Sequence, residues 1–348
     1  MTPYSISSDH HFHDWSQFSK TNCDGVNSRL RIILDEFERQ AEALLKAGGK
    51  RLFMAGDTFH VRGKVNPEVL NPVMDTMRKV CASGVEVFAI AGNHDLSTAS
   101  STKLGNSMQA LDEIAGFTAV TAPSLFGDVM MIPWIEQLDE LRAEAINFAD
   151  KQHDLIIHAP LNGVIKGLPD LGLDPSECAA WGYRRVFIGH YHAHSVFQNG
   201  SVISIGSTSH QCWSDPGTLA GFLIVHDDRV EHHESQAPKF VNIDSESEIT
   251  PQALKGNYAR LRLKDADAKA LTAAHAAVEQ AGALGWVDHS SKKRDVVRPM
   301  SSSAGNMTLE VSVANYVLHH TKAPGLDKRR IAQDALAILT QARSVGDE

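Results

Sequence analysis

The first two hundred residues alternate between two patterns of apolar positions. Short continuous apolar runs at residues 4–8 and 51–57 are typical of buried strands. Between them, residues 28–47 repeat apolar positions at helical spacing, and Gly48 and Gly49 follow as a stop signal. The apolar positions of this helix are Leu30, Ile33, Leu34, Phe37, Ala41, Leu44 and Leu45. The pattern therefore predicts a strand, an amphipathic helix and a second strand.

The same order recurs further along the chain. Residues 67–83 predict a helix that begins at Pro67 and ends before Gly84, and the run 85–95 predicts the next strand. Further predicted elements are a helix near 137–150, strands at 154–160, 183–194 and 201–207, and a hairpin at 221–234. Because strand–helix–strand alternation favours parallel pairing, we predict an α/β fold with helices on the faces of the sheet.

The character of the sequence changes near residue 250. Alternating apolar residues at 257–264 predict a strand, and an alanine-rich helix follows near 266–281. Residues 288–306 are polar and rich in Ser, Lys and Arg, which is typical of a linker or loop. Two short amphipathic helices, near 308–320 and 327–343, close the chain. The predicted parts are a main domain at 1–245, a small domain at 250–300 and a helical segment at 301–348.

Composition places the chain among ordinary globular proteins, with 43% hydrophobic and 22% charged residues. No run reaches the roughly 18 apolar residues of a membrane helix, so we expect no membrane partner. The N-terminal segment lacks the basic start and apolar stretch of a signal peptide, which predicts a cytoplasmic, intracellular protein. The four cysteines form no C-x-x-C pair, so neither a disulfide framework nor a zinc knuckle is indicated. A formal net charge of −9 argues against a protein that coats nucleic acid by charge alone.

Histidine is the unusual residue, with 18 copies. Several of them lie in five short motifs that follow predicted strands, where open α/β sheets gather their ligand sites. The motifs are Asp9-His10-His11, Gly56-Asp57-Thr58-Phe59-His60, Gly92-Asn93-His94-Asp95, His158, and Gly189-His190-Tyr191-His192. A lone histidine is more often structural or solvated, which is the interpretation for most of the others. For His194 and His210, contact with a substrate remains a second interpretation.

The residue types and spacing of the motifs predict a pair of metal ions. Residues i and i+2 of an extended chain point the same way, so Asp9 and His11 can face one site, and so can His190 and His192. Carboxylate oxygen and imidazole nitrogen form a ligand set that suits manganese, iron or zinc. Seven such groups exceed the needs of one tetrahedral zinc. Two ions about 3.5–4 Å apart, as in phosphate-ester hydrolases, fit the count better.

The order D-x-H, GD, GNHD, H, GHxH resembles the motif set of the calcineurin-like metallophosphoesterases over residues 5–225. The resemblance implies a four-layer α/β/β/α sandwich with a small α+β cap and C-terminal helices. It implies two divalent cations, with Mn²⁺ favoured and Mg²⁺, Fe²⁺ or Zn²⁺ as alternatives. The resemblance implies that Asp9, His11 and His192 bind the first metal, that Asn93, His158 and His190 bind the second, and that Asp57 bridges both. His94 would contact the scissile phosphate or donate a proton to the leaving oxygen. Asp95 would orient His94.

A narrower resemblance comes from Phe59 and His60, which directly follow Asp57. GDTFH is similar to the GD-x-F-H of SbcD-type nucleases, in which this second histidine orients the DNA phosphate, a role implied here for His60. The resemblance implies a metal-dependent exonuclease or endonuclease in DNA repair, recombination or degradation. It implies that residues 250–300 form a capping domain and that 301–348 dock on an SbcC-type coiled-coil ATPase. It also implies a homodimer.

Other interpretations are compatible with parts of the sequence. The segment ISIGSTSHQCWSD lacks the proline that many SbcD proteins have before their glycine-serine pair, and it resembles phage-type versions. A stand-alone phosphatase or cyclic-nucleotide phosphodiesterase would share the core motifs, but it needs no cap or docking helices. A scaffold that has lost its metals is disfavoured because none of the seven ligands is missing. The run Lys292-Lys293-Arg294 is either a solvated loop or a DNA contact.

Overall fold

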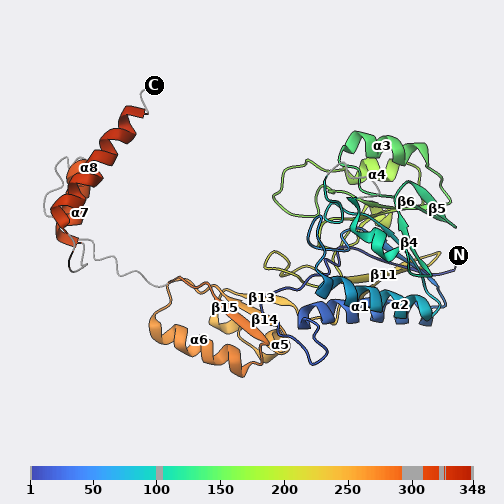
Figure 1. Ribbon diagram of the computed structural model, residues 1–348, viewed down its shortest axis with the longest axis horizontal. Coiled ribbons are helices and arrows are strands. Elements are labelled where there is room, and N and C mark those ends of the chain that lie inside the picture. The colour runs from blue at the N-terminus through green and yellow to red at the C-terminus, as the bar shows by residue number, and fades with distance from the viewer. Residues whose placement is uncertain (1, 99–104, 292–308, 321–324, 326, 346–348) are drawn as a thin grey trace. The chain divides into compact units, whose positions relative to one another are not determined.

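The computed structural model describes residues 2–98, 105–291, 309–320, 325 and 327–345. The chain divides into two compact units, residues 1–293 and 294–348. The first unit contains three sheets, and the second contains the two C-terminal helices (Figure 1). In the part of the chain that the structure describes, no helix is both long enough and apolar enough to cross a membrane.

The first sheet has six strands in the order β12-β11-β1-β2-β3-β4. Four of them, β1 to β4, run parallel, and β11 and β12 complete one edge in antiparallel pairing. The strands are β1 (Tyr4–Ser7), β2 (Arg51–Ala55), β3 (Glu86–Ile90), β4 (Phe117–Val120), β11 (Gly221–Val225) and β12 (Val230–Glu234). Helices α1 (Ser28–Lys46) and α2 (Pro67–Ala82) pack on its outer face. The predicted parallel pairing of the first three strands is confirmed.

The second sheet also has six strands, in the order β5-β6-β7-β8-β10-β9. Its four inner strands are parallel, and each edge strand pairs antiparallel with its neighbour. The strands are β5 (Ser124–Phe126), β6 (Val129–Ile132), β7 (Asp154–His158), β8 (Arg185–Gly189), β9 (Ser195–Phe197) and β10 (Val202–Ser204). Helices α3 (Leu138–Asn147) and α4 (Pro175–Ala180) cover its outer face. The 3₁₀ helices are η2 (Ser107–Leu111), η3 (Gln198–Gly200) and η4 (Glu246–Glu248).

Buried side chains divide this part of the chain into four layers. Along β2, Leu52 and Met54 pack toward α1 and α2, whereas Phe53 and Ala55 face the second sheet. The same alternation in β7 sends Ile156 between the sheets. Because each sheet is covered by helices on one face and by the other sheet on the second, the architecture is an α/β/β/α sandwich, as the motif resemblance implies.

A third, smaller sheet follows the sandwich in sequence and has its own core. Its elements are β13 (Phe240–Ile243), α5 (Pro251–Leu254), β14 (Tyr258–Leu261), α6 (Ala268–Gln280) and β15 (Gly285–Asp288). The proposed cap at 250–300 supplies two of the three parallel strands, and β13 precedes residue 250. Phe18, from the loop after β1, stacks on Tyr258 at 4.8 Å between ring centroids, so the small sheet packs against the edge of the sandwich.

The second unit consists of α7 (Leu309–His320) and α8 (Lys328–Val345), which pack against each other. Both helices lie where the sequence pattern predicts them. The Lys292-Lys293-Arg294 run lies outside the described residues.

Candidate metal centre

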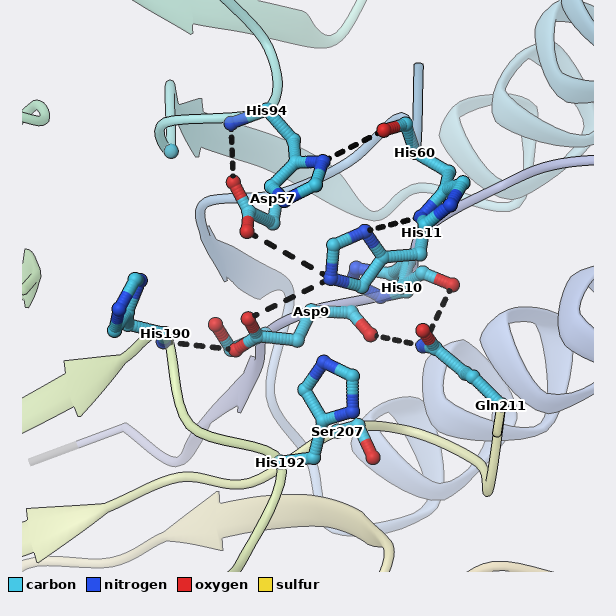
Figure 2. A network of polar contacts seen from close by, with 12 residues as sticks. Asp9, His10, His11, Asp57, His60, His94, His190, His192, Ser207 and Gln211 are labelled. Carbon is cyan, nitrogen blue, oxygen red and sulfur yellow. Dashed lines mark hydrogen bonds and ion pairs between the residues drawn. The ribbon is translucent and has the colours of Figure 1, made fainter. Parts of the chain in front are cut away.

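The five sequence motifs meet at one edge of the sandwich, and Figure 2 shows residues from four of them. Asp9 and His11 follow β1, Asp57 follows β2, and Asn93 follows β3 in the first sheet. The histidines of the second sheet are His158, the last residue of β7, and His190 and His192, which follow β8. Parallel strands of both sheets end here, so the seven side chains expected to bind metal come from two sheets and converge.

Four of these residues have left-handed backbone conformations. The φ angles are 53° at Asp9, 45° at His11, 51° at Asp57 and 118° at His190. A non-glycine residue in such a region costs on the order of 1–3 kcal/mol and persists where its surroundings fix it. Asp9 and His11 therefore face one site because the backbone kinks sharply after β1. The sequence prediction that they share a site through the alternation of an extended strand gave the wrong reason.

The first group of side chains consists of Asp9, His11 and His192, whose ligand atoms all lie within 4.8 Å of one another. The carboxylate of Asp9 is fully buried. Its Oδ2 accepts the backbone N–H of His190 at 3.0 Å, whereas Oδ1 has no hydrogen-bond partner among the described residues. A buried carboxylate oxygen without a donor is costly, and a cation beside it would remove that cost.

The second group consists of Asp57, His158 and His190, again within 4.8 Å of one another. Asn93 joins them, because its Oδ1 lies 3.3 Å from Nε2 of His158 and 3.1 Å from Nδ1 of His190. Oδ2 of Asp57 lies 3.4 Å from Nε2 of His158 and 3.6 Å from Nε2 of His11. Asp57 is thus the carboxylate between the two groups, and together they suit two divalent cations.

The charges at this centre are strongly coupled. Burial opposes the ionised form of Asp57, yet the histidines beside it, chiefly His158, hold its pKa well below the usual range. Burial likewise opposes the charged form of His158, but Asp57 and Asp9 raise its pKa to about 9. Burial and the charge of Asp57 raise the pKa of Asp9. Without a cation, a proton on His158 therefore balances the carboxylates, and a cation bound there would displace it.

His94 lies beside both groups but is held by different neighbours than the sequence suggests. Its backbone N–H donates to Oδ1 of Asp57 at 2.8 Å, and its ring Nδ1 donates to the carbonyl oxygen of His60 at 2.6 Å. Asp95 is fully buried, and its carboxylate instead accepts the backbone N–H groups of Gly92, Thr58 and Phe59. The expected role of Asp95 as the group that orients the ring of His94 is therefore revised. Asp95 fixes the loops after β2 and β3, and the His60 carbonyl orients the ring.

The side chain of His60 lies against a metal-site histidine. Its Nδ1 is 3.3 Å from Nδ1 of His11, and His11, His60 and His94 form a third group with ligand atoms within 4.8 Å of one another. The His60 ring also stacks on His94 and packs against Trp15. Burial, with a smaller contribution from His13, lowers the pKa of His60 to about 4. A neutral His60 is thus placed to support the ring of His11.

Sequence reasoning did not identify Asp215 and Gln211, which lie behind the first group. Oδ1 of Asp215 is 3.1 Å from Nδ1 of His192, and Nε2 of Gln211 donates to the carbonyl oxygens of Asp9 and His10. Burial would raise the pKa of Asp215, but hydrogen bonds, first that of His192, lower it to about 2. The one available signal was the unusual segment ISIGSTSHQCWSD, in which both residues lie.

The two histidines left open by the sequence have separate environments. Both ring nitrogens of His210 are bonded to backbone groups, to the carbonyl of Thr218 and to the N–H of Phe240, which favours the structural interpretation. His194 borders a cleft of about 740 Å³ that begins at His190 and His192. Tyr191 and Lys166 also line this cleft, so a substrate at the centre has room to extend along it.

Comparison with known proteins agrees with the motif resemblance. No protein-family model matches the chain. Exonuclease subunit 1 of Enterobacteria phage T4 is 23% identical over 198 residues, which cover 53% of this chain and 55% of the phage protein. The chain thus spans about half the length of this curated relative. The match confirms, at the level of sequence similarity, the resemblance to a nuclease subunit.

Two proteins of known structure are among those that resemble this chain. Nuclease MPE of Pseudomonas putida is 14% identical, with a TM-score of 0.31 over 66% of this chain and 87% of that one. A dimetal phosphatase from Danio rerio is 12% identical, with a TM-score of 0.37 over 66% of this chain and 94% of that one.

Proposed function

We propose that the chain is a two-metal nuclease that hydrolyses phosphodiester bonds in DNA. The observation that carries the proposal is Oδ2 of Asp57, which lies between His158 at 3.4 Å and His11 at 3.6 Å. Two groups of nitrogen and oxygen ligands around one shared carboxylate match the requirement for a cation pair. DNA as substrate is supported by the similarity to a phage exonuclease subunit.

The proposed ligand sets follow the two groups of side chains. The first cation would be held by Asp9, His11 and His192, the second by Asn93, His158 and His190, and Asp57 would contact both. This mixed set of carboxylate, amide and imidazole groups favours Mn²⁺, with Mg²⁺, Fe²⁺ or Zn²⁺ as alternatives. When bound, such a cation pair makes a water molecule more acidic and neutralises charge that develops on the phosphoryl oxygens.

His94 is the proposed general acid. The His60 carbonyl can only accept a hydrogen bond, so Nδ1 of His94 carries a hydrogen and Nε2 is the ring nitrogen free to act. The bond from its backbone N–H to Asp57 keeps the ring beside the proposed cations. A protonated Nε2 would then donate its hydrogen to the leaving sugar oxygen. Asp95 supports this arrangement by holding the two loops together, and His60 is proposed to contact the DNA phosphate as well.

The cellular role and partners are proposed from the same similarities. A phage relative named as an exonuclease subunit supports a role in a nuclease complex, in DNA repair, recombination or degradation. The pair α7 and α8 forms a unit of its own, which suits a segment that docks on a coiled-coil ATPase of the SbcC type. We also propose that residues 250–300 form a capping domain and that the protein forms a homodimer. Sedimentation with and without such an ATPase would test the assembly.

A panel of substrates tests the proposed reaction. Purified protein loaded with Mn²⁺ is expected to cleave single- or double-stranded DNA, and to act far less on cyclic nucleotides or nitrophenyl phosphate. The same panel after removal of cations with a chelator gives the background. Efficient hydrolysis of the small esters with no cleavage of DNA would establish the rival interpretation, a phosphatase or cyclic-nucleotide phosphodiesterase.

Gly92→Ala is expected to reduce DNA cleavage about 10²-fold. A Cβ atom at residue 92 would lie 2.1 Å from Oδ1 of Asp57 and 2.4 Å from its backbone nitrogen, so the bridging carboxylate must move. A displacement of about 1 Å in a reacting arrangement costs on the order of 10²-fold in rate. Turnover of DNA and bound Mn²⁺ per chain would be measured together.

The matched control for this substitution is Gly84→Ala in the turn after α2. Gly84 has a φ of 93°, so alanine there is strained, but a Cβ would have no heavy atom within 4 Å. It is expected to lower stability while leaving turnover near the wild-type value. Equal loss of activity in both variants would mean that strain in general, rather than displacement of Asp57, limits the enzyme.

A further inference from the structure

Asp215 lies in the irregular loop between β10 and β11, and it touches a proposed metal ligand. We propose that Asp215 is a positioning residue that fixes His192 as a ligand of the first cation. The proposal rests on the two-metal function given above. It gives a function to the segment from Gly206 to Asp215, which contains none of the proposed metal ligands.

The contact between the two side chains selects one form of the imidazole ring. Oδ1 of Asp215 lies 3.1 Å from Nδ1 of His192. A carboxylate oxygen accepts a hydrogen bond, so Nδ1 carries the hydrogen and the lone pair is on Nε2. Nε2 is then the atom that His192 offers to a cation shared with Asp9 and His11. Histidine ligands in metal sites commonly have such a carboxylate on the second nitrogen, which fixes both tautomer and ring orientation.

Asp215 is itself held rigidly. Its side chain is buried, with 2% of its surface exposed. Oδ2 accepts the backbone N–H groups of Gln211 at 2.7 Å and Cys212 at 3.0 Å. These two bonds orient the carboxylate. Oδ1 faces His192 and also accepts the hydroxyl hydrogen of Ser214 at 3.2 Å. The loop therefore presents an acceptor whose position is set before any cation binds.

The same loop also reaches the other side of the first group. Nε2 of Gln211 donates to the carbonyl oxygen of Asp9 at 2.6 Å and to that of His10 at 3.2 Å (Figure 2). Asp9 has a left-handed backbone, and this bond holds its carbonyl in place. Two ligands from different sheets, Asp9 and His192, are thus supported by residues four positions apart in one loop.

Asp215→Asn is the sharpest substitution, because it preserves shape and replaces the acceptor Oδ1 with a donor; the hydroxyl of Ser214 can rotate to accept from that donor. The amide oxygen of asparagine can still accept the N–H groups of Gln211 and Cys212. Its NH₂ group then faces Nδ1 of His192 and donates to it. The hydrogen of the imidazole must move to Nε2, which can no longer bind a cation. Loss of such a supporting partner typically weakens metal affinity about 10–100-fold.

Calorimetric titration of metal-free protein with Mn²⁺ tests the proposal. Wild type is expected to bind two ions, and Asp215→Asn to bind one with unchanged affinity and the other about 10–100-fold more weakly. Asp112→Asn is the matched control, since Asp112 accepts the backbone N–H of Ala119 far from the centre and should not change binding. Unchanged binding of both ions in Asp215→Asn overturns the proposal.

A double-mutant cycle separates positioning of His192 from a general effect on the loop. In a His192→Ala background, Asp215→Asn should cause no further loss of Mn²⁺ affinity, because the residue through which Asp215 acts is gone. Additive losses would instead show that Asp215 supports the loop alone, and would overturn the proposal.

Nitrogen-15 spectra of histidine in the metal-free wild type give a test that does not depend on a folded Asp215 variant. His192, assigned by its absence in His192→Ala, is expected to carry its hydrogen on Nδ1, and a hydrogen on Nε2 overturns the inference. Failure of the inference and failure of the proposed function differ in outcome. A wild type that binds no Mn²⁺ contradicts both. Binding of two ions by wild type, with unchanged affinities in Asp215→Asn, contradicts only the inference.

Discussion

Asp57→Asn is expected to remove both cations and to lower DNA cleavage by at least about 10³-fold. Oδ1 of Asp57 accepts the N–H of His94, and the amide oxygen of asparagine can keep that bond. The NH₂ group then replaces Oδ2, the atom that lies between His158 and His11, and presents a donor to both cation positions. The cations supply several kcal/mol of transition-state stabilisation, and each 1.36 kcal/mol is about tenfold in rate.

Metal content and turnover would be measured on the same preparation. Asp75→Asn is a suitable control, because Asp75 is an exposed residue of α2 that pairs with Arg78 away from the centre. The control should retain two Mn²⁺ ions and full activity. An Asp57→Asn protein that holds two ions and cleaves DNA within tenfold of wild type would show that the carboxylate is not the bridge.

His94→Ala has the second largest expected effect, a loss of about 10²–10⁴-fold in turnover with both cations retained. General acid catalysis contributes about this much when a side chain protonates a poor leaving group. His94 is not among the proposed ligands, and its contacts to the His60 carbonyl and to Asp57 place it beside them. Its removal should therefore affect the chemical step and leave Mn²⁺ binding unchanged.

The leaving group provides the decisive comparison for His94. DNA releases a sugar hydroxyl that needs a proton, whereas a nitrophenyl ester of thymidine phosphate releases an anion that does not. The loss caused by His94→Ala should be large for DNA and small for the ester. An equal loss for both substrates would identify His94 as a phosphate contact, and a loss of bound Mn²⁺ would identify it as a ligand.

The strand–helix–strand order of the first sheet could be predicted from the apolar pattern because its central elements are long or strongly apolar, whereas the two-sheet sandwich follows only from the motif resemblance. Helix α1 was expected at 28–47 and spans Ser28–Lys46, and β2 and β3 are continuous apolar runs between helices. The sequence pattern does not predict β4, β5, β6, β9, β13 and β15. Each has only three or four residues, too few for a local pattern to show. The strands β13 and β15 are stabilised by pairing with β14, a long-range contact that no local pattern reveals.

The candidate site could be predicted as a set of residue types but not as a set of contacts. The motifs fall at strand ends, so convergence within each sheet, of Asp9 with Asp57 and of His158 with His190, follows from parallel topology. The partner of the His94 ring could not be foreseen, because it is a backbone carbonyl that any residue would offer. Asp215 was missed for a related reason. It lies 23 positions beyond His192 in an irregular loop, and neither its burial nor its direction follows from the sequence.

The left-handed backbone at Asp9, His11, Asp57 and His190 sets function against stability. Glycine adopts such angles freely, so a chain selected only for a stable fold would place glycine at these positions. A glycine, however, has no ligand to offer. Without bound cations, the centre should therefore be the part of the sandwich that unfolds locally most readily. The concentration of free cation should set the stability of this region, since a ligand that binds only the folded state stabilises it by mass action. The survival of this protein in a cell would then depend on the metal supply as much as its catalysis does.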